Sequence, residues 1–162
     1  MGSRLRQQNG RMYSVRPLSA RSPHEPEALA GIFDLYRSHY GETIDLGRSA
    51  SWLAHQLEAG LNVLVAEDDS TIVGFVTWVR IPASLRLGLY WQIRDLFVLP
   101  AHRRRGIALA LLDAVRSAAE VSGALRLALQ TEEENEAALG LYRKAGYVPV
   151  PGYRVLMLPL GE

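Results

Sequence analysis

Hydrophobic residues recur along the chain with two different periods, which together predict both helices and strands. Leu29, Phe33, Tyr36 and Tyr40 lie three or four positions apart, as on one face of an amphipathic helix. Short β-rich runs bounded by turn residues, such as 71–80, are typical of strands. The predicted elements are a strand at 13–18, helices at 26–39 and 49–59, strands at 61–67, 71–80 and 89–99, a helix at 105–122, a strand at 124–130, a helix at 135–145, and strands at 147–150 and 153–158.

This order of elements, β-α-α-β-β-β-α-β-α-β-β, predicts an α/β (α+β) fold. The chain contains no internal repeat and no linker of biased composition, so we expect one domain over residues 12–162. Residues 1–11 are polar and basic, and we expect them to be a disordered extension or a remnant of cloning, with Met12 as an alternative start.

Composition and charge narrow the classes of function. The net charge of +1 gives no reason to expect nucleic acid or an anionic membrane as partner. Because the chain has no cysteine, disulfides, thiolate metal ligands and a cysteine nucleophile are excluded, which fits a cytoplasmic protein. No apolar run approaches the ~20 residues of a membrane-spanning helix. The 4 histidines show no metal-ligand spacing, so we expect no metal.

The most informative stretch is 95–112, in which an apolar strand stops at Pro100, crosses a basic turn and becomes a helix. Free backbone amides and the helix dipole make such a turn an anion site. The stretch has neither the glycine-lysine pattern of a P-loop nor the three glycines of a dinucleotide fingerprint. It has instead Arg-x-x-Gly-x-Ala at 103–108. A solvated basic helix start is the alternative interpretation of its three arginines.

Two further blocks accompany this turn at a characteristic spacing. Asp95-Leu-Phe-Val98 precedes it, and a second signature follows the predicted helix and strand. That signature is Thr131-x-x-x-Asn135-x-x-Ala138-x-x-Leu141-Tyr142-x-x-x-Gly146-Tyr147. Together the blocks resemble the acetyl-CoA-binding region of the GNAT N-acetyltransferase superfamily. They are most similar to the branch of yeast histone/polyamine-type acetyltransferases and its bacterial relatives.

The resemblance implies a mixed, mostly antiparallel sheet that splays apart and holds acetyl-CoA in the opening. It implies that the backbone of Leu96, Phe97 and Val98 contacts the acetyl and pantetheine groups, next to a β-bulge that turns an amide toward the thioester. The amides from Arg104 through Gly106 and Ile107 to Ala108 are then expected to hold the pyrophosphate. The resemblance further places the side chains of Arg103, Arg104 and Arg105 beside the phosphates, and that of Asn135 against the pantetheine arm.

The same resemblance makes Tyr142 the expected general acid, because a phenol near the sulfur can protonate the departing CoA thiolate. The alternative is that Tyr142 is a core aromatic residue. The general base stays open between Asp95, Glu67 and a water relay through Gln92, since Arg94 stands where relatives often carry glutamate. Asp95 is equally well interpreted as a structural partner. Strand alternation predicts Trp91, Ile93 and Asp95 on one face.

The sequence says least about which residues bind the acceptor substrate. The first helix usually shapes the acceptor pocket in this family, so Tyr36, Tyr40 and Glu42 are candidates. Glu132 is another, although acids in a first helical turn also complement the dipole. The resemblance implies an acetyl-CoA-dependent N-acetyltransferase acting on a primary amine by direct transfer. The alternative is a non-catalytic acyl-CoA-binding regulatory or interaction module. The last predicted strands are candidates for pairing in a homodimer, or for ordinary burial.

Overall fold

The computed structural model describes residues 3–6, 12–18, 24–152 and 154–160, with the backbone alone for 3–6 and 12. The chain divides into two compact units, Met1–Gln130 and Thr131–Glu162. No helix among the described residues combines the length and the apolar character needed to cross a bilayer.

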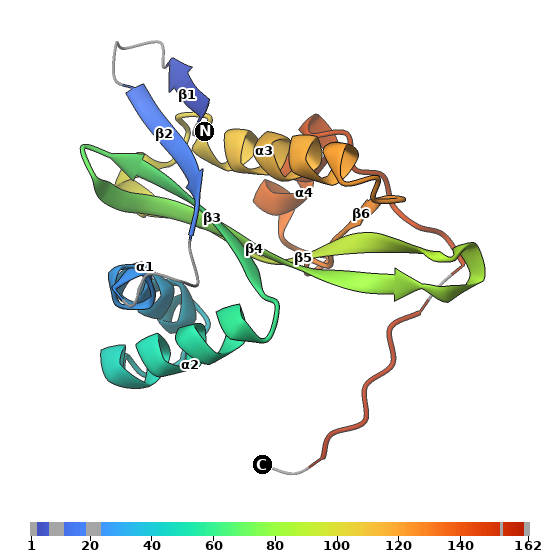
Figure 1. Cartoon of the computed structure of the whole chain (residues 1–162), viewed down its shortest axis with the longest axis horizontal. Helices are drawn as coiled ribbons and strands as arrows, with labels where there is room; N and C mark the ends of the chain where they lie inside the picture. The colour runs from blue at the N-terminus through green and yellow to red at the C-terminus, as the bar shows by residue number, and fades with distance from the viewer. Residues whose placement is uncertain (1–2, 7–11, 19–23, 153, 161–162) are drawn as a thin grey trace. The chain divides into compact units, whose positions relative to one another are not determined.

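One mixed sheet organises the first unit (Figure 1). Within the described residues its strands follow one another in sequence order, and all neighbours are antiparallel except the last pair. This confirms the predicted mixed, mostly antiparallel sheet. The strands are β1 (Ser3–Arg6), β2 (Met12–Pro17), β3 (Asn62–Asp68), β4 (Thr71–Ala83), β5 (Gly88–Val98) and β6 (Leu127–Ala128).

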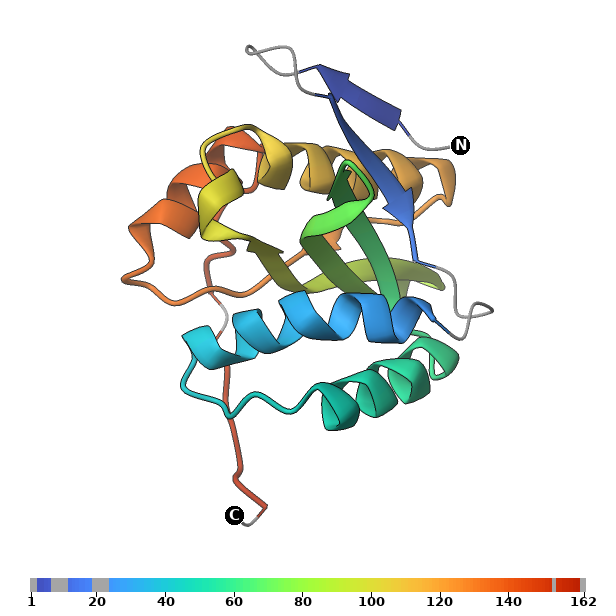
Figure 2. The same cartoon turned by 90° about the vertical axis from the view of Figure 1, so that its left-hand side faces the viewer.

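Helices cover both faces of this sheet. Figure 2 shows α1 (Glu25–His39) and α2 (Leu46–Glu58) on one face, and α3 (Ile107–Val121) on the other. Short 3-10 turns, η1 (Ser84–Arg86) and η2 (Pro100–His102), flank β5. The core between α1, α2 and the sheet includes the buried side chains of Leu29, Phe33, Leu53, Val65, Phe75 and Phe97. Burial of these apolar surfaces is the main force that holds the helices on the sheet.

The sheet opens between its last two strands. β6 pairs with β5 only at Trp91 and Gln92, whereas β5 stays paired with β4 as far as Val98. Over 93–98, β5 therefore has one edge that no strand of the described residues occupies. The splay implied by the family resemblance is confirmed at this place.

Several boundaries in the first unit differ from the prediction. α2 begins at Leu46 rather than at Ser49, because the Asp45 carboxylate accepts the amide N–H of Arg48 at 3.0 Å and caps the helix. β6 is shorter than predicted. Of the N-terminal segment expected to be a disordered extension or a remnant of cloning, residues 1–2 and 7–11 lie outside the described residues, whereas Ser3–Arg6 pairs with β2. Backbone pairing of this kind does not require an apolar sequence.

The second unit contains α4 (Glu136–Lys144). Its N-cap is Asn135, whose Oδ1 accepts the amide N–H of Ala138 at 3.1 Å. Strands at 147–150 and 153–158 were wrongly predicted, because the described residues 147–152 and 154–160 form none. Prolines 149, 151 and 159 lack the N–H that a ladder needs. Tyr153 lies outside the described residues.

Candidate active site

A β-bulge interrupts β5 immediately before the informative stretch. Thr77 of β4 pairs with Asp95 and Trp78 pairs with Ile93, so Arg94 is an extra residue without a partner on β4. The resemblance implied a bulge near 96–98, and the structure has one at Arg94. A bulge of this kind bends the strand and reverses the direction of the following backbone groups.

The reversal can be followed from the hydrogen bonds. The amide of Trp91 donates to Arg126 next to β6, at 3.0 Å. After the bulge, the amide of Leu99 donates to Val73 of β4, at 2.9 Å. Because backbone groups alternate along a strand, Leu96 and Val98 direct theirs away from β4, toward the unpaired edge. Two amides of β5 thus face the opening.

The bulge also moves Asp95 to the other face of the sheet. Trp91 stacks on Trp78, with ring centroids 5.4 Å apart, whereas Asp95 accepts the hydroxyl of Tyr36 on α1 at 2.9 Å. The prediction that Trp91, Ile93 and Asp95 share one face was therefore wrong for Asp95, since the extra residue shifts the alternation by one.

Thr77 holds the Asp95 carboxylate in place through hydrogen bonds. Its buried hydroxyl donates to Asp95 Oδ2 and accepts the amide N–H of Asp95 at 3.1 Å. Oδ1 receives the Tyr36 hydroxyl, so both carboxylate oxygens accept hydrogen bonds from the protein. Thr77 could not be identified from sequence patterns, because the register between β4 and β5 depends on a bulge that no local pattern shows.

The turn after β5 is built for close approach to the backbone. Arg104 and Gly106 have φ of +61° and +78°, and a Cβ at Gly106 would meet no atom within 4 Å. No backbone oxygen of the described residues accepts from the amides of 104–109. These amides include those of Ile107 and Ala108, at the start of α3, where the helix dipole is positive. The turn therefore has the donors and the open space that an anion requires.

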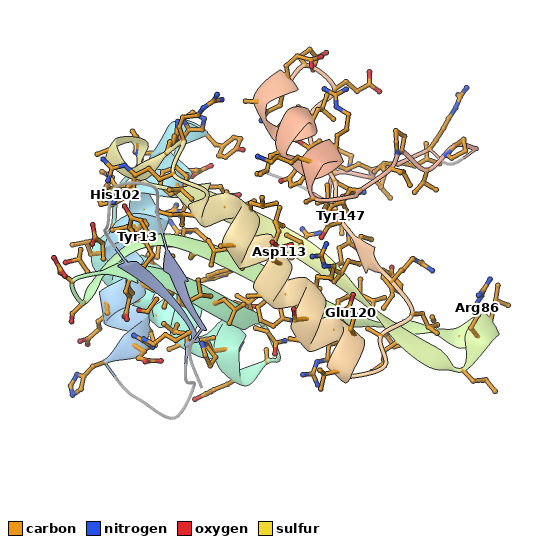
Figure 3. All side chains as sticks on the ribbon, turned by 90° about the horizontal axis from the view of Figure 1, so that it is seen from above. Tyr13, Arg86, His102, Asp113, Glu120 and Tyr147 are labelled. Atoms are coloured by element: carbon orange, nitrogen blue, oxygen red, sulfur yellow. The ribbon has the colours of Figure 1, made fainter. Side chains whose placement is uncertain are left out.

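Two arginine side chains of the turn brace it against the sheet. Arg103 Nε donates to the carbonyl oxygen of Val98 at 3.0 Å, and its guanidinium lies 5.6 Å from the centre of the Phe97 ring. Arg105 Nη1 donates to the hydroxyl of Tyr13 in β2 at 3.1 Å. Tyr13 also contacts His102 edge-on, and Figure 3 labels both beside the turn. These contacts tie 102–105 to β2 and β5.

The acceptor candidates of α1 are placed around Asp95. Tyr36 contacts it directly, and the exposed Tyr40 contacts Tyr36 edge-on, with centroids 5.4 Å apart. Glu42 forms an exposed ion pair with Arg37, at 3.5 Å. Gln92 is half-buried in β5 between Val79 and Ala128. Tyr36 is therefore the candidate that the structure brings to Asp95, and Tyr40 contacts Tyr36.

A buried carboxylate that the sequence analysis missed holds this side together. Asp34 of α1 is 1% exposed and accepts hydrogen bonds from Arg37 at 2.8 Å, from the Ser49 hydroxyl, and from the amide of Asp45 at 2.9 Å. Burial by itself would raise the pKa of Asp34, but the hydrogen bonds outweigh it and hold that pKa below its ordinary value. The network joins α1, α2 and the loop between them.

Glu67, a candidate base, is committed elsewhere. Its carboxylate pairs with Arg16 of β2 at 2.7 Å, and Arg16 also reaches Glu25 at 2.6 Å. The hydrogen bonds that Arg16 donates to Glu67 raise the pKa of the Arg16 guanidinium, although desolvation opposes this. We therefore do not retain Glu67 as a base.

The second unit carries the remaining candidates. Tyr142 is half-buried on α4 and packs edge-on against Tyr147, with centroids 5.8 Å apart. Asn135 uses its Oδ1 as the helix cap, and Glu132 is exposed ahead of it. The ring contact fits the alternative of a packed aromatic residue, and the roles of all three in catalysis or binding stay predictions.

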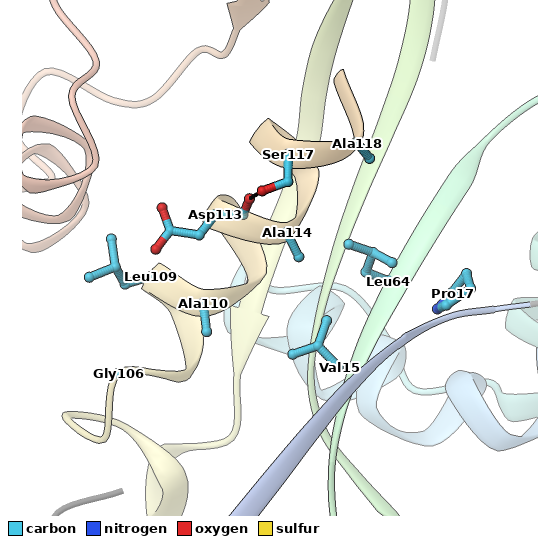
Figure 4. A pocket seen from close by; sticks show the side chains of 10 residues that line it. All are labelled: Val15, Pro17, Leu64, Gly106, Leu109, Ala110, Asp113, Ala114, Ser117 and Ala118. Atoms are coloured by element: carbon cyan, nitrogen blue, oxygen red, sulfur yellow. Dashed lines mark hydrogen bonds between the residues drawn. The ribbon is translucent and has the colours of Figure 1, made fainter. Parts of the chain in front are cut away.

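The described residues contain no group of three or more His, Cys, Asp or Glu side chains that could hold a metal ion. A pocket of about 570 Å³ lies between α3 and the strands β2 and β3. Figure 4 shows Ala110 and Ala114 of α3 facing Val15, while Asp113 points away. The pocket reaches the turn only at Gly106 and presents no arrangement of polar groups, so we assign it no ligand.

Known proteins resemble this chain over most of its length. The model of the acetyltransferase (GNAT) family matches residues 29–147. The uncharacterised N-acetyltransferase YhfO of Bacillus subtilis is 34% identical over 127 residues, which are 78% of this chain and 85% of that protein. The crystal structure of a probable acetyltransferase has a TM-score of 0.83 at 24% identity, covering 91% of this chain and 98% of its own.

A ribosomal-protein-alanine N-acetyltransferase from Brucella melitensis biovar Abortus 2308 has a TM-score of 0.75 at 22% identity, covering 92% of this chain and 99% of its own. At such identities the structural likeness shows the fold alone, whereas the family model and the Bacillus relative show descent. The chain therefore belongs to the acetyltransferase (GNAT) family, whose members use acetyl-CoA, and is an enzyme of the acyltransferase class.

Proposed function

We propose that this enzyme transfers the acetyl group of acetyl-CoA directly to a primary amine. The observation that carries the proposal is the continuity of the site along the chain. Asp95 lies at the bulge, the amides of Leu96 and Val98 face the unpaired edge of β5, and the amides of 104–109 follow at the turn. One segment thus offers groups for the acceptor amine, the thioester and the pyrophosphate, in that order.

The backbone of the turn and of β5 binds acetyl-CoA in this proposal. The amides of 104–108 donate to the pyrophosphate, and the open space at Gly106 lets the phosphates approach. The Val98 amide faces the unpaired edge and is the proposed donor to the thioester oxygen. The carbonyl oxygen of the same residue accepts from Arg103. A donor aimed at the charge that develops on that oxygen contributes about 3 kcal/mol in other acyl-transfer enzymes. Asn135 would contact pantetheine through Nδ2, since Oδ1 caps α4.

Asp95 is the proposed general base. The acceptor ammonium gives a proton to its carboxylate, and the nitrogen lone pair then attacks the thioester carbon. A C–N bond forms and the C–S bond breaks, and Tyr142 protonates the departing sulfur. The second proton of the nitrogen replaces the one that Tyr142 gives up, so the products are the amide, CoA thiol and one proton released from Asp95.

Thiol release tests the proposal. Acetyl-CoA is incubated with the enzyme and a set of primary amines, and free thiol is measured against time. We expect turnover with at least one amine and none with the corresponding tertiary amine. Binding of CoA without turnover on any amine would contradict amine acetylation, and absence of CoA binding would contradict the assignment of the turn.

We also propose that residues 154–160 bind a second copy of the chain. Val155, Leu156, Met157 and Leu158 are each more than three-quarters exposed, which is a large apolar surface for a segment without regular structure. Analytical ultracentrifugation of the protein should show a dimer, and Leu156→Asp should shift it toward the monomer. A wild-type protein that sediments as a monomer at micromolar concentration would contradict this proposal.

The similarity to the yeast histone/polyamine-type branch stays a prediction, because it depends only on the Asp95–Val98 and Thr131–Asn135 patterns. The kind of acceptor can be approached from the side chains around Asp95.

A further inference from the structure

A row of four aromatic rings runs across α1 and α2 beside Asp95. Trp52 stacks on Phe33 at 5.5 Å, Phe33 contacts Tyr36 at 5.9 Å, and Tyr36 contacts Tyr40 at 5.4 Å between centroids. The middle is buried, with Phe33 only 6% exposed, while both ends reach the surface, with Trp52 46% and Tyr40 57% exposed. Tyr36 also donates to Asp95, so Tyr40 is the exposed ring that contacts the tyrosine bound to the candidate base.

Two large apolar side chains follow Tyr40 in an exposed stretch that also carries the charged Glu42 and Arg48. Ile44 and Leu46, in the loop and first turn that lead into α2, are each 56% exposed. Large aliphatic and aromatic side chains that are exposed together around a polar group are typical of a ligand-binding surface rather than of solvated loops.

Three carboxylates between 34 and 45 already have protein partners. Asp34 is buried and holds Arg37, Glu42 pairs with the same arginine, and Asp45 caps α2. The remaining acid between 34 and 58 is Glu58, at the opposite end of α2. Among the described residues 34–58, a second ammonium group would thus compete with a protein partner for every carboxylate except Glu58.

We infer that the acceptor is a monoamine that carries an aromatic or aliphatic group next to its amino nitrogen. This inference rests on the proposed function. The ammonium binds the Asp95 carboxylate, and the apolar group covers the exposed side chains of Tyr40 and Ile44. An acceptor with several ammonium groups, such as a polyamine or an amino sugar, would place further charges beside these apolar side chains, in a segment whose carboxylates at 34–45 already have protein partners.

A free arylalkylamine and the N-terminal residue of a peptide both have this chemistry. The experiment measures kcat and KM for thiol release at saturating acetyl-CoA with phenethylamine, the peptide Phe-Gly-Gly, spermidine and kanamycin. We expect kcat/KM for phenethylamine or for the peptide to exceed that for spermidine and kanamycin by about ten-fold or more, in line with the worth of an apolar contact in a specificity pocket. Whichever of phenethylamine and the peptide has the higher kcat/KM shows whether the acceptor is a free amine or the N-terminus of a peptide.

Variants at the two exposed ends of the row test the role of Tyr40. Tyr40→Ala should raise KM for the preferred amine about ten-fold, with kcat within about two-fold, because it removes a binding contact made equally in ground and transition states. Tyr40→Phe should retain the wild-type KM. Trp52→Ala is the matched control: it truncates an equally exposed aromatic side chain on α2 and should leave KM unchanged.

Preference for spermidine or kanamycin, or an unchanged KM in Tyr40→Ala, would overturn the inference while leaving amine acetylation intact. An enzyme that binds acetyl-CoA and acetylates none of the four compounds would instead contradict the proposed function, and the inference with it. The comparison of acceptors uses the wild-type protein and so does not depend on how any variant folds.

Discussion

The two sides of the opening along β5 are built in different ways. Apart from the proposed contacts of Asn135 and Tyr142, the side proposed for acetyl-CoA consists of backbone groups from one continuous segment, 94–109, with a bulge, an unpaired edge and a turn. The side proposed for the acceptor consists of side chains from separate segments: Tyr36 and Tyr40 of α1, Thr77 of β4, and Asp95 of β5.

This difference suggests how one fold serves many acceptors. A backbone site tolerates changes in most side chains and needs only a few residues with special conformations, such as Gly106. A side-chain site can change with each substitution on α1 or α2. We expect substitutions on the two sides to separate in experiments, affecting acetyl-CoA on one side and the acceptor or the stability of the α1–α2 pair on the other.

The largest expected effect concerns the network that supports the acceptor side. Asp34→Ala leaves Arg37, Ser49 and the Asp45 amide without their shared acceptor, and should lower the free energy of unfolding by about 3 kcal/mol at pH 7. Urea denaturation of both proteins measures this difference. Gly31→Ala, on the exposed face of the same helix, is the control and should be stabilising by about 0.5–1 kcal/mol.

The same network predicts a pH dependence of stability. The pKa of Asp34 is lowered in the folded state, so its ionised form stabilises the fold above the unfolded pKa of about 4. That contribution is lost as the pH falls from there through the folded value. Wild type and Asp34→Ala should therefore converge in stability toward low pH. A difference that stays constant down to pH 2 would contradict the lowered pKa.

Asp95→Asn tests the proposed base, which lies between the acetyl-CoA side and the acceptor side. It keeps the shape of the side chain but removes the proposed base, so kcat should fall about 100-fold or more. Affinity for CoA, measured by calorimetry, should stay within a few-fold, because the pyrophosphate site is formed by backbone at 104–108. Unchanged turnover in this variant would restrict Asp95 to a structural role.

Tyr142→Phe removes the proposed proton donor to sulfur and should lower kcat about ten-fold, with CoA binding retained. Tyr147→Phe, at its ring neighbour, is the matched control and should have little effect on turnover. If the two variants behave alike, Tyr142 acts as a packed aromatic residue and not as an acid.

Gly106→Ala should have the smallest effect. An alanine at φ +78° costs about 1 kcal/mol, and its methyl group would lie where the phosphates approach. KM for acetyl-CoA should rise several-fold, while kcat with saturating acetyl-CoA stays near wild type. A change in KM for the amine, and not in KM for acetyl-CoA, would contradict the assignment of the turn to acetyl-CoA.

Most of the backbone side could be predicted from sequence because its signals are local. The helix after the turn was placed within two residues at its start, since Gly106 and the apolar stripe of 107–119 are contiguous. The face of Asp95 could not be predicted, because one extra residue at Arg94 reverses the alternation.

The acceptor side depends on contacts between distant segments. Thr77 meets Asp95 only through strand register, and Asp34 meets Ser49 only through helix packing, so neither contact has a local pattern. The two strands predicted after α4 have a local apolar pattern but do not form. An apolar run forms a strand only where the edge of another strand pairs with it.

The most direct test of the account compares the binding of two thioesters to the wild-type enzyme by isothermal titration calorimetry. Acetyl-CoA carries the pyrophosphate and the 3′-phosphoadenosine attached to it, and acetyl-pantetheine carries neither. If the backbone amides of 104–108 hold the pyrophosphate, acetyl-CoA should bind about 100-fold more tightly or better, and added salt should reduce the difference. Equal affinity for the two compounds would contradict the assignment of this turn as the acetyl-CoA site.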